Sequence, residues 1–251
     1  MYREKSARAT VRVGKDAAGL MQLLDRQESE GNAEYAYRVL SYNILMLNIP
    51  PAAFIQETRI GEKLGMSKGP VHQAIMLLRG NSLVDVKPRS ATHVSLINLD
   101  AVSQGFFLRS AVEPAVFTEL QNSHSQECIV RLAENVAAQR HALVEENFDV
   151  FSFIHLDDEF HHIIYIADNK SLIWDSLKKV TSHFDRIRYM GLILGYEKAA
   201  SSEHEYLLDL LSGKRDISVE DTKIFIVNHL KHYQSYLDQM VDDHPSYFRT
   251  K

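Results

Sequence analysis

The chain is poor in cysteine and in long apolar runs, and each shortage excludes a class of protein. Cys128 is the only cysteine among 251 residues, so no disulfide can form within the chain. A chain without internal disulfides suits a reducing compartment, and we expect a cytoplasmic protein. In this setting Cys128 is interpreted as a small, half-buried helix residue rather than a redox group.

Membrane insertion and secretion are equally unsupported. No run of about 18 apolar residues occurs, so no membrane-spanning helix is expected. The first fifteen residues, MYREKSARATVRVGK, are basic but lack the apolar core of a secretory signal. With 45% hydrophobic and 24% charged residues, the composition is that of a soluble globular chain, and its length suffices for two modest domains.

The net charge of −5 is unusual for a protein that binds nucleic acid, but the charge is unevenly distributed. Basic residues concentrate in the first fifteen positions and between positions 63 and 89. They are Arg3, Lys5, Arg8, Arg12, Lys15, Lys63, Lys68, Arg79, Lys87 and Arg89. An acidic C-terminal half joined to a basic N-terminal region is compatible with specific DNA binding.

Residues 54–94 have the pattern of a helix, a sharp turn and a second helix. The first helix is expected at Gln56–Leu64, with Ile60 and Leu64 on one apolar face, and Gly65 follows it in the position where left-handed residues close helices. Ser67 is a suitable N-cap for the second helix. A helix pair of this kind can place its second member in the major groove of DNA, although it is also a compact way to pack two helices.

The second helix would bury Val71, Ile75 and Leu78, with Pro70 in its first turn. A two-stranded wing follows, with strands at 83–86 and 92–94 and a basic turn between them. The outward side chains of this region are candidates for base and phosphate contacts. These candidate DNA-binding residues are Arg59, Ser67, Lys68, Gly69, His72, Gln73, Lys87, Arg89 and His93.

A winged-helix domain is therefore predicted at residues 32–97, with its first helix at 33–47. Residues 1–31 form an N-terminal extension. Within it, Ala17–Glu28 has the apolar spacing of a short amphipathic helix. The extension could pack on the domain, cover a partner subunit, remain mobile or touch DNA phosphates through its basic residues.

Residues 98–251 show helical periodicity without strand alternation, which predicts an all-α bundle. Turn residues divide this domain into six helices. The expected ranges are 99–122, 126–146, 149–167, 171–192, 196–213 and 218–242. The fold class predicted for the whole chain is mainly α, with a winged helix-turn-helix domain followed by a six-helix bundle.

Four residues of this second domain have the chemistry of a metal site. Asp157 and His161 lie four positions apart on one helix face, while His204 and His229 lie on two later helices. One carboxylate and three imidazoles would bind a divalent transition metal and leave positions open for water or ligand. The alternative is that each histidine is a core residue that hydrogen-bonds a neighbour and binds nothing.

The helix-turn-helix carries a family resemblance. Its order of Leu64-Gly65, Ser67, Pro70-Val71 and Ala74, followed by Leu83-Val84 and a Pro-Arg wing, resembles the winged helix of the GntR family of bacterial transcription regulators. That family usually has Arg, Thr and Arg-Glu where this chain has Lys68, Gly69 and His72-Gln73, and glycines where it has Ser82 and Ala91. Lysine does not replace arginine in bidentate guanine reading, so the resemblance extends to the fold and not to the operator sequence.

The C-terminal half resembles the FCD ligand-sensing domain of the FadR subfamily, in a six-helix form similar to the VanR-type branch. The resemblance rests on Arg109 with Glu113, Asp157 with His161, Glu203-His204 and His229-Leu230. It implies that Asp157, His161, His204 and His229 bind a divalent metal. A histidine-rich nitrogen and oxygen site suits zinc, nickel or another divalent ion, and zinc or nickel is expected. The resemblance also implies a small carboxylate effector, for which Arg109, Ser110, Arg186 and Arg188 are candidates.

Together these patterns predict a transcription regulator and not an enzyme. It would bind a pseudo-palindromic double-stranded operator as a homodimer, and an effector at the metal would alter operator affinity. Two alternatives are a DNA-binding protein with a purely structural metal and a metal-dependent hydrolase or oxygenase. The enzyme would leave the helix-turn-helix without a role, and no separate general base or nucleophile motif accompanies the metal pattern.

Overall fold

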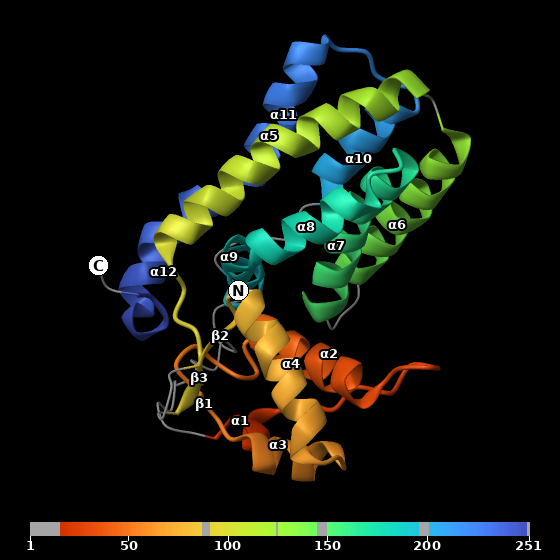
Figure 1. Ribbon diagram of the computed structural model, residues 1–251. Helices are drawn as coiled ribbons and strands as arrows, with labels where there is room; N and C mark the ends of the chain where they lie inside the picture. Colours follow the sequence, from red (N-terminus) through yellow and green to blue (C-terminus); the bar gives the residue numbers. More distant parts are fainter. Residues whose placement is uncertain (1–15, 87–90, 124, 145–149, 196–200, 250–251) are drawn as a thin grey trace. The chain divides into compact units, whose positions relative to one another are not determined.

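The structure is a computed structural model that describes residues 16–86, 91–123, 125–144, 150–195 and 201–249 (Figure 1). The chain divides into two compact units, one formed by residues up to Val102 together with those from Gln239 onward, the other by Ser103–Asp238. The chain is mainly helical, and the predicted fold class is confirmed. None of the described helices has both the length and the apolar composition needed to cross a membrane.

The first unit contains the helix-turn-helix and a small sheet. Its elements are α1 Ala17–Leu20, α2 Asn32–Leu45, β1 Phe54–Ile55, α3 Glu57–Leu64, α4 Lys68–Gly80, β2 Val84–Val86 and β3 Thr92–Val94. The remaining helices belong to the second unit, except that α5 begins and α12 ends in residues of the first unit. They are α5 Leu99–Ser123, α6 Gln126–Val144, α7 Val150–Ala167, α8 Ser171–Val180, α9 Ser182–Ile193, α10 Ser201–Leu211, α11 Val219–Lys231 and α12 Leu237–Asp243, with 3-10 turns at His232–Ser235 and Pro245–Tyr247.

The turn between α3 and α4 follows the predicted design. Gly65 ends α3 with φ at 66°, in the left-handed region where glycine avoids the steric cost of a side chain. The amide of Met66 donates to the carbonyl of Gly61 at 2.9 Å, which closes the turn. Ser67 occupies the N-cap position of α4, but its side chain makes no capping hydrogen bond. Ser67 is exposed.

The wing has one strand more than expected. Its antiparallel sheet has the order β1-β3-β2, in which β3 pairs Val94 with Val84 of β2 and His93 with Phe54 of β1. The sequence indicated only the β2 and β3 strands, because two residues are too few to show alternation. The turn at 87–90, with the predicted DNA contacts Lys87 and Arg89, lies outside the described residues.

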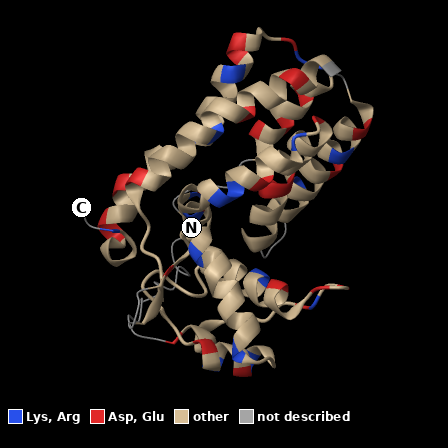
Figure 2. Ribbon diagram, viewed as in Figure 1, with Lys and Arg blue, Asp and Glu red and all other residues tan. Residues whose placement is uncertain are grey.

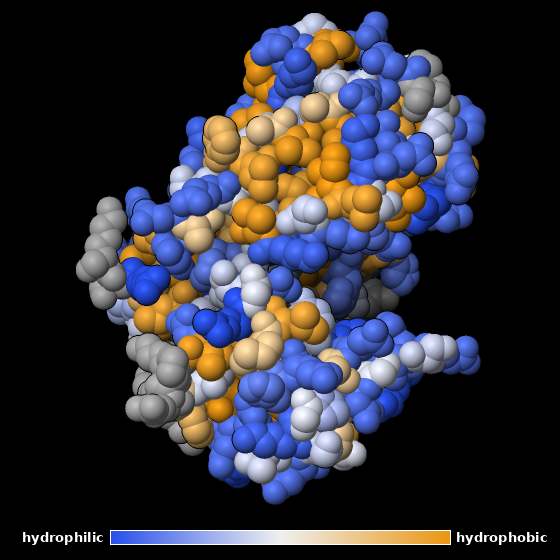
Figure 3. All heavy atoms as spheres, in the orientation of Figure 1, coloured by the Kyte–Doolittle hydropathy of each residue, from blue (hydrophilic) through white to orange (hydrophobic). Residues whose placement is uncertain are grey.

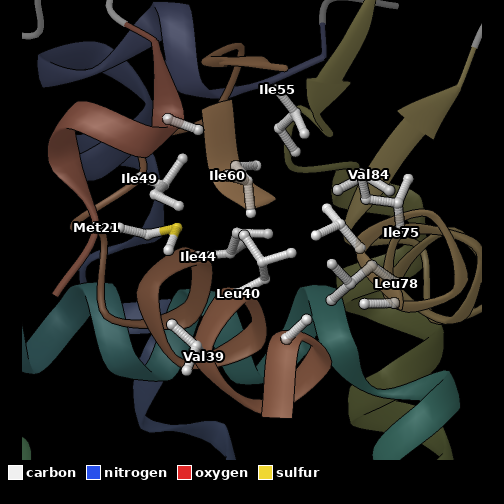
Figure 4. Packing of buried hydrophobic residues seen from close by; sticks show 14 of the residues in the cluster. Met21, Val39, Leu40, Ile44, Ile49, Ile55, Ile60, Ile75, Leu78 and Val84 are labelled. Carbon is white, nitrogen blue, oxygen red and sulfur yellow. The ribbon is translucent and has the colours of Figure 1, made fainter. Parts of the chain in front are cut away.

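Figure 4 shows how the first unit packs around α2. Leu40 and Ile44 of α2 meet Ile60 of α3 and Ile75 and Leu78 of α4 in one apolar cluster. This core fixes α4 against α3 and leaves the opposite face of α4 in solvent. The helix therefore presents a fixed outer surface.

The N-terminal extension departs from prediction. The helix expected at Ala17–Glu28 is only four residues long, and the described chain from Met21 to Glu30 contains no regular element. Ala17, Ala18 and Met21 are nevertheless buried in the core of the first unit. Hydrogen bonds to Asn43 of α2, whose side chain contacts both the amide and the carbonyl of Gln22, hold this segment in an extended form instead.

The prediction of six helices in the C-terminal half is wrong, because two predicted helices are divided. The helix expected at 171–192 breaks at Thr181, whose hydroxyl donates to Asp185 and whose carbonyl accepts from the Asp185 amide. The helix expected at 218–242 divides into α11, a 3-10 turn and α12. In the described residues this half therefore contains eight α-helices.

The end of the chain returns to the first unit, which no sequence pattern indicated. Ile97 donates to the carbonyl of Tyr247 at 2.8 Å, and Arg249 donates to the carbonyl of Ile97 at 2.9 Å. Phe248 is 5% exposed. These backbone bonds tie the C-terminal segment to the chain that follows the wing.

The contrast between two adjacent leucines of α4 gives a test of its packing. Leu78 is 0% exposed, whereas Leu77 is 54% exposed. We expect Leu78→Ala to lower the free energy of unfolding by about 2–5 kcal/mol, because it leaves a cavity in the core. Leu77→Ala should change it by less than about 0.5 kcal/mol. Urea unfolding of both variants measures this, and equal effects would contradict the assigned orientation of α4.

Cys128 offers a test of the helical core. The thiol is 3% exposed, and burial raises its pKa to about 11. Because only the thiolate reacts, we expect alkylation at about pH 8 to be on the order of a hundredfold slower in the folded protein than in denaturant. Alkylation of the folded protein at the rate of the unfolded chain would show that α6 is not packed as described.

Candidate functional site

Three histidines from three helices converge inside the second unit. His161 on α7, His204 on α10 and His229 on α11 each offer a ring nitrogen within 4.8 Å of the other two. The Nε2 atoms of His161 and His229 are 3.4 Å apart. His161 is 0% and His204 1% exposed, whereas His229 is only partly buried. The predicted convergence of these residues is therefore present in the structure.

The opposite nitrogen of each ring has its own partner. The Nδ1 atoms of His161, His204 and His229 lie 2.5 Å from Glu113, 2.8 Å from the Gln139 side-chain oxygen and 2.7 Å from Glu203, respectively. Ionised carboxylates and amide oxygens only accept, so each Nδ1 carries the proton and each Nε2 keeps its lone pair. Histidines that bind metals are held in this way, with the outer N–H donated to a carboxylate or carbonyl.

The spacing of the inward atoms fits one ion. Two atoms that lie about 2.1 Å from a metal in tetrahedral directions are about 3.4 Å apart. The Nε2 atoms of His161 and His229 have this separation, and Asp157 Oδ1 lies 3.6 Å from His204 Nε2. Among the described residues, His204 Nε2 is buried without a hydrogen-bond partner, which is unusual for a polar atom. The donor set and its spacing thus fit a divalent transition metal.

Burial and neighbouring charges keep the ligands in the required protonation states. Burial lowers the pKa of His161 and His204, in the first case against the pull of Glu113. Burial opposes ionisation of Asp157, but the charge of Arg188 holds its pKa well below the usual value. Neutral imidazoles beside an ionised carboxylate are the forms that bind metal.

The four predicted effector residues have different surroundings. Arg109 donates twice to Glu113, at 2.7 and 3.0 Å, and is 2% exposed. Arg188 donates to Asp157 Oδ2, which leaves Oδ1 on the side of His204. Arg186 is fully buried on α9, and the Ser110 hydroxyl is buried without a hydrogen-bond partner in the described part of the chain. Their role toward an effector stays a prediction.

Several residues of this region had no signal in the sequence. Gln139 lies on α6, outside any recognised motif, and is oriented by the hydrogen bond that its amide donates to Asn135 at 2.7 Å. Lys178 donates to Asp158 at 2.9 Å and to Asp185 at 2.7 Å, and so balances two carboxylates next to Arg188. Both contacts depend on tertiary packing, which single-sequence spacing does not reveal.

The predicted DNA-binding residues in the described part of the chain lie mostly on the outer face of α4 and beside it. Ser67, Lys68, Gly69, His72 and Gln73 are all exposed. Arg59 pairs with Asp16 at 3.1 Å, and His93 is partly buried against Phe54. Figure 2 shows that acidic and basic residues alternate over α3 rather than forming a purely basic face. These residues stay predicted contacts.

Comparisons with known proteins find a matching domain family and similar proteins. Residues 104–220 match the FCD domain family. The HTH-type transcriptional repressor RspR of Escherichia coli (strain K12) is 29% identical over 155 residues, which cover 62% of this chain and 67% of that protein. An uncharacterized HTH-type transcriptional regulator in an unstable DNA locus of Streptomyces ambofaciens is 27% identical over 161 residues, or 64% of this chain and 66% of that protein.

Two solved structures share the fold. Escherichia coli McbR/YncC has a TM-score of 0.66 at 16% identity and covers 84% of this chain and 98% of its own. A putative transcriptional regulator GntR from Rhodococcus sp. RHA1 has a TM-score of 0.66 at 16% identity, with 82% and 97% covered. At this identity the likeness extends to the arrangement of elements only.

Removal of two inward histidines tests the cluster. We expect His204→Ala combined with His229→Ala to abolish stoichiometric binding of zinc or nickel, because two of the three inward lone pairs are lost. His162→Ala is the control, since this neighbouring residue of α7 stacks on Trp174 and takes no part in the cluster. Metal per chain is measured after dialysis, and unchanged content in the double variant would contradict the site.

Proposed function

Because the chain belongs to the GntR family of transcription regulators and carries an FCD domain at residues 104–220, we propose that it binds a double-stranded DNA operator under the control of a small carboxylate effector. The relatives found are transcription regulators and not enzymes, so the hydrolase or oxygenase alternative is set aside. A regulator of this kind acts in the cytoplasm.

The proposed DNA contact is made by α4. Its inner face is anchored by Val71, Ile75 and Leu78, all 0% exposed, so its outer side chains have a defined direction. A helix of 13 residues can lie in the major groove with its N-terminal turn toward the base edges. In this arrangement Gly69, His72 and Gln73 approach the bases, while Arg59, Ser67, Lys68 and His93 lie near the sugar-phosphate backbone. Lys87 and Arg89, outside the described residues, stay predicted contacts.

The protein would act as a homodimer, since two reading helices related by a two-fold axis match two half-sites of a pseudo-palindrome. Exposed apolar side chains on the second unit support an association surface. Phe107 of α5 and Leu172 of α8 are 72% and 81% exposed, and Val180 of α8 is also exposed. Figure 3 shows apolar residues gathered over the face that carries these two helices.

The observation that carries the effector proposal is the set of three Nε2 atoms that face one centre while each Nδ1 is held from behind. Asp157 and the three histidines would hold a divalent ion, zinc or nickel, which when bound supplies a Lewis acid for a carboxylate oxygen. The hydroxyls of Ser110 and Tyr165 are buried without partners in the described residues, and support a polar ligand nearby.

Control of DNA binding requires that the effector distinguish two arrangements of the protein. An effector that bound both equally would shift nothing, however tightly it bound. Arg109, Arg186 and Arg188 are the candidate carboxylate partners, with a purely structural metal as the alternative.

The test is operator binding by metal-loaded and chelator-treated protein, with and without a panel of small organic acids. Acids that change operator affinity only in the metal-loaded protein support the proposal. If none of the acids changes operator affinity, a purely structural metal is favoured.

The DNA contact itself is tested by binding to the DNA upstream of its own gene at two salt concentrations, with unrelated DNA for comparison. We expect Lys68→Ala to weaken operator binding several-fold and to reduce the slope of log affinity against log salt by about 0.9, the loss of one phosphate contact. Lys179→Ala, an exposed lysine of α8, should change neither quantity. Equal behaviour of the two variants would mean that α4 is not the DNA-binding element.

A further inference from the structure

The carboxylate of Glu57 contacts two of the side chains that are predicted to bind DNA, Lys68 and His72. Glu57 is the first residue of α3, and its Oε1 is 2.9 Å from His72 Nδ1 while its Oε2 is 3.3 Å from Lys68 Nζ. The Glu57 side chain is 17% exposed, whereas those of Lys68 and His72 are 65% and 56% exposed. The carboxylate is therefore covered by the two residues that reach into solvent.

Helix geometry explains why one acid serves both residues. Lys68 and His72 are four positions apart on α4, so they stand one turn above each other on the same face. Glu57 lies in the first turn of α3, where the helix dipole favours a negative charge. Burial opposes its ionisation, but His72 and Lys68 keep its pKa below the usual value.

The contact determines which nitrogen of His72 carries the proton. An ionised carboxylate can only accept a hydrogen bond, so the Nδ1 that faces Glu57 at 2.9 Å must be the donor. In the neutral ring the proton on Nδ1 leaves Nε2, on the opposite side, as an acceptor. In this neutral form the exposed end of His72 presents a hydrogen-bond acceptor to whatever lies against α4.

The major groove displays groups that such an acceptor can distinguish. Adenine N6 and cytosine N4 offer amino donors there, whereas guanine O6 and N7 and thymine O4 only accept. A His72 ring with Nε2 as acceptor would favour an amino donor at its base position. Lys68 keeps ammonium protons beyond the one directed at Glu57, and these remain for a phosphate or an acceptor base edge.

We propose that Glu57 is a positioning residue that sets the base preference of α4 by fixing the tautomer and the direction of His72. The inference rests on the proposed function, in which α4 reads the operator. Glu57 does not itself contact DNA, and it acts through the two side chains that cover it. Its charge also offsets that of Lys68. Base preference, and not affinity, is therefore the property whose change identifies the role of Glu57.

The experiment selects binding sites from a randomised duplex library with full-length protein. We expect Glu57→Ala to lose, by about tenfold, the discrimination at the same base position where His72→Ala loses it. Glu57→Gln keeps a carbonyl acceptor for Nδ1 and should retain the wild-type preference. Glu62→Ala removes the same charge from an exposed position of α3 and should also select wild-type sites.

A second measurement reads the tautomer without DNA. Nitrogen-15 chemical shifts of the His72 ring should report a proton held on Nδ1 in the wild-type and Glu57→Gln proteins, and a proton shared between the two nitrogens in Glu57→Ala. This signature distinguishes positioning of the ring from general support of the fold, which circular dichroism of each variant monitors.

The outcomes separate two failures. If wild-type protein selects a defined site and Glu57→Ala selects the same site with the same discrimination, the role of Glu57 is overturned while the proposed function stands. An unchanged His72 ring spectrum in Glu57→Ala overturns it as well. If the wild-type protein selects no site at all, the reading role of α4 fails, and the inference that depends on it fails with it.

Discussion

The polar contacts of the outer nitrogens of His161, His204 and His229 are the interactions on which the candidate metal centre depends. Three imidazoles that share one buried space would otherwise adopt either tautomer and rotate to satisfy one another. Glu113, Gln139 and Glu203 remove that freedom, because each accepts from the Nδ1–H of one ring. The inward lone pairs are thus a consequence of outward contacts, and the cluster is organised before any ion arrives.

These acceptors bring charge into the interior, which explains the ionic network around them. A buried carboxylate is costly unless a cation and hydrogen bonds accompany it. Arg109 accompanies Glu113, Arg188 accompanies Asp157, and Lys178 bonds the remaining pair of aspartates on α7 and α9. Arg109 and Arg188, two of the arginines proposed to bind an effector, are therefore also the residues that keep the candidate metal ligands and their supports ionised. An effector carboxylate that engaged one of them would also perturb the ligand set.

The sequence predicted those parts of the molecule that depend on neighbours along the chain. The turn before α4 follows from Gly65 and the apolar spacing around it, and the meeting of the three histidines was expected from a family resemblance. It did not predict the break at Thr181, because neither glycine nor proline stands there and threonine alone does not signal the end of a helix. The role of Gln139 was equally invisible, since a glutamine on a helix surface carries no motif until another helix places a histidine against it.

The same physical device occurs in both units of the chain, at very different depths. In the second unit an acceptor behind a buried imidazole leaves Nε2 facing a shared centre. In the first unit Glu57 contacts Nδ1 of the exposed His72, which leaves Nε2 as the acceptor of the neutral ring. Burial decides what each free nitrogen can meet, because an enclosed lone pair among other ligands suits a metal, whereas an exposed one on an anchored helix suits a donor on a base edge. The assignment of both sites thus rests on which atom of a histidine is already occupied, a property that depends on the partner behind the ring and not on the histidine itself.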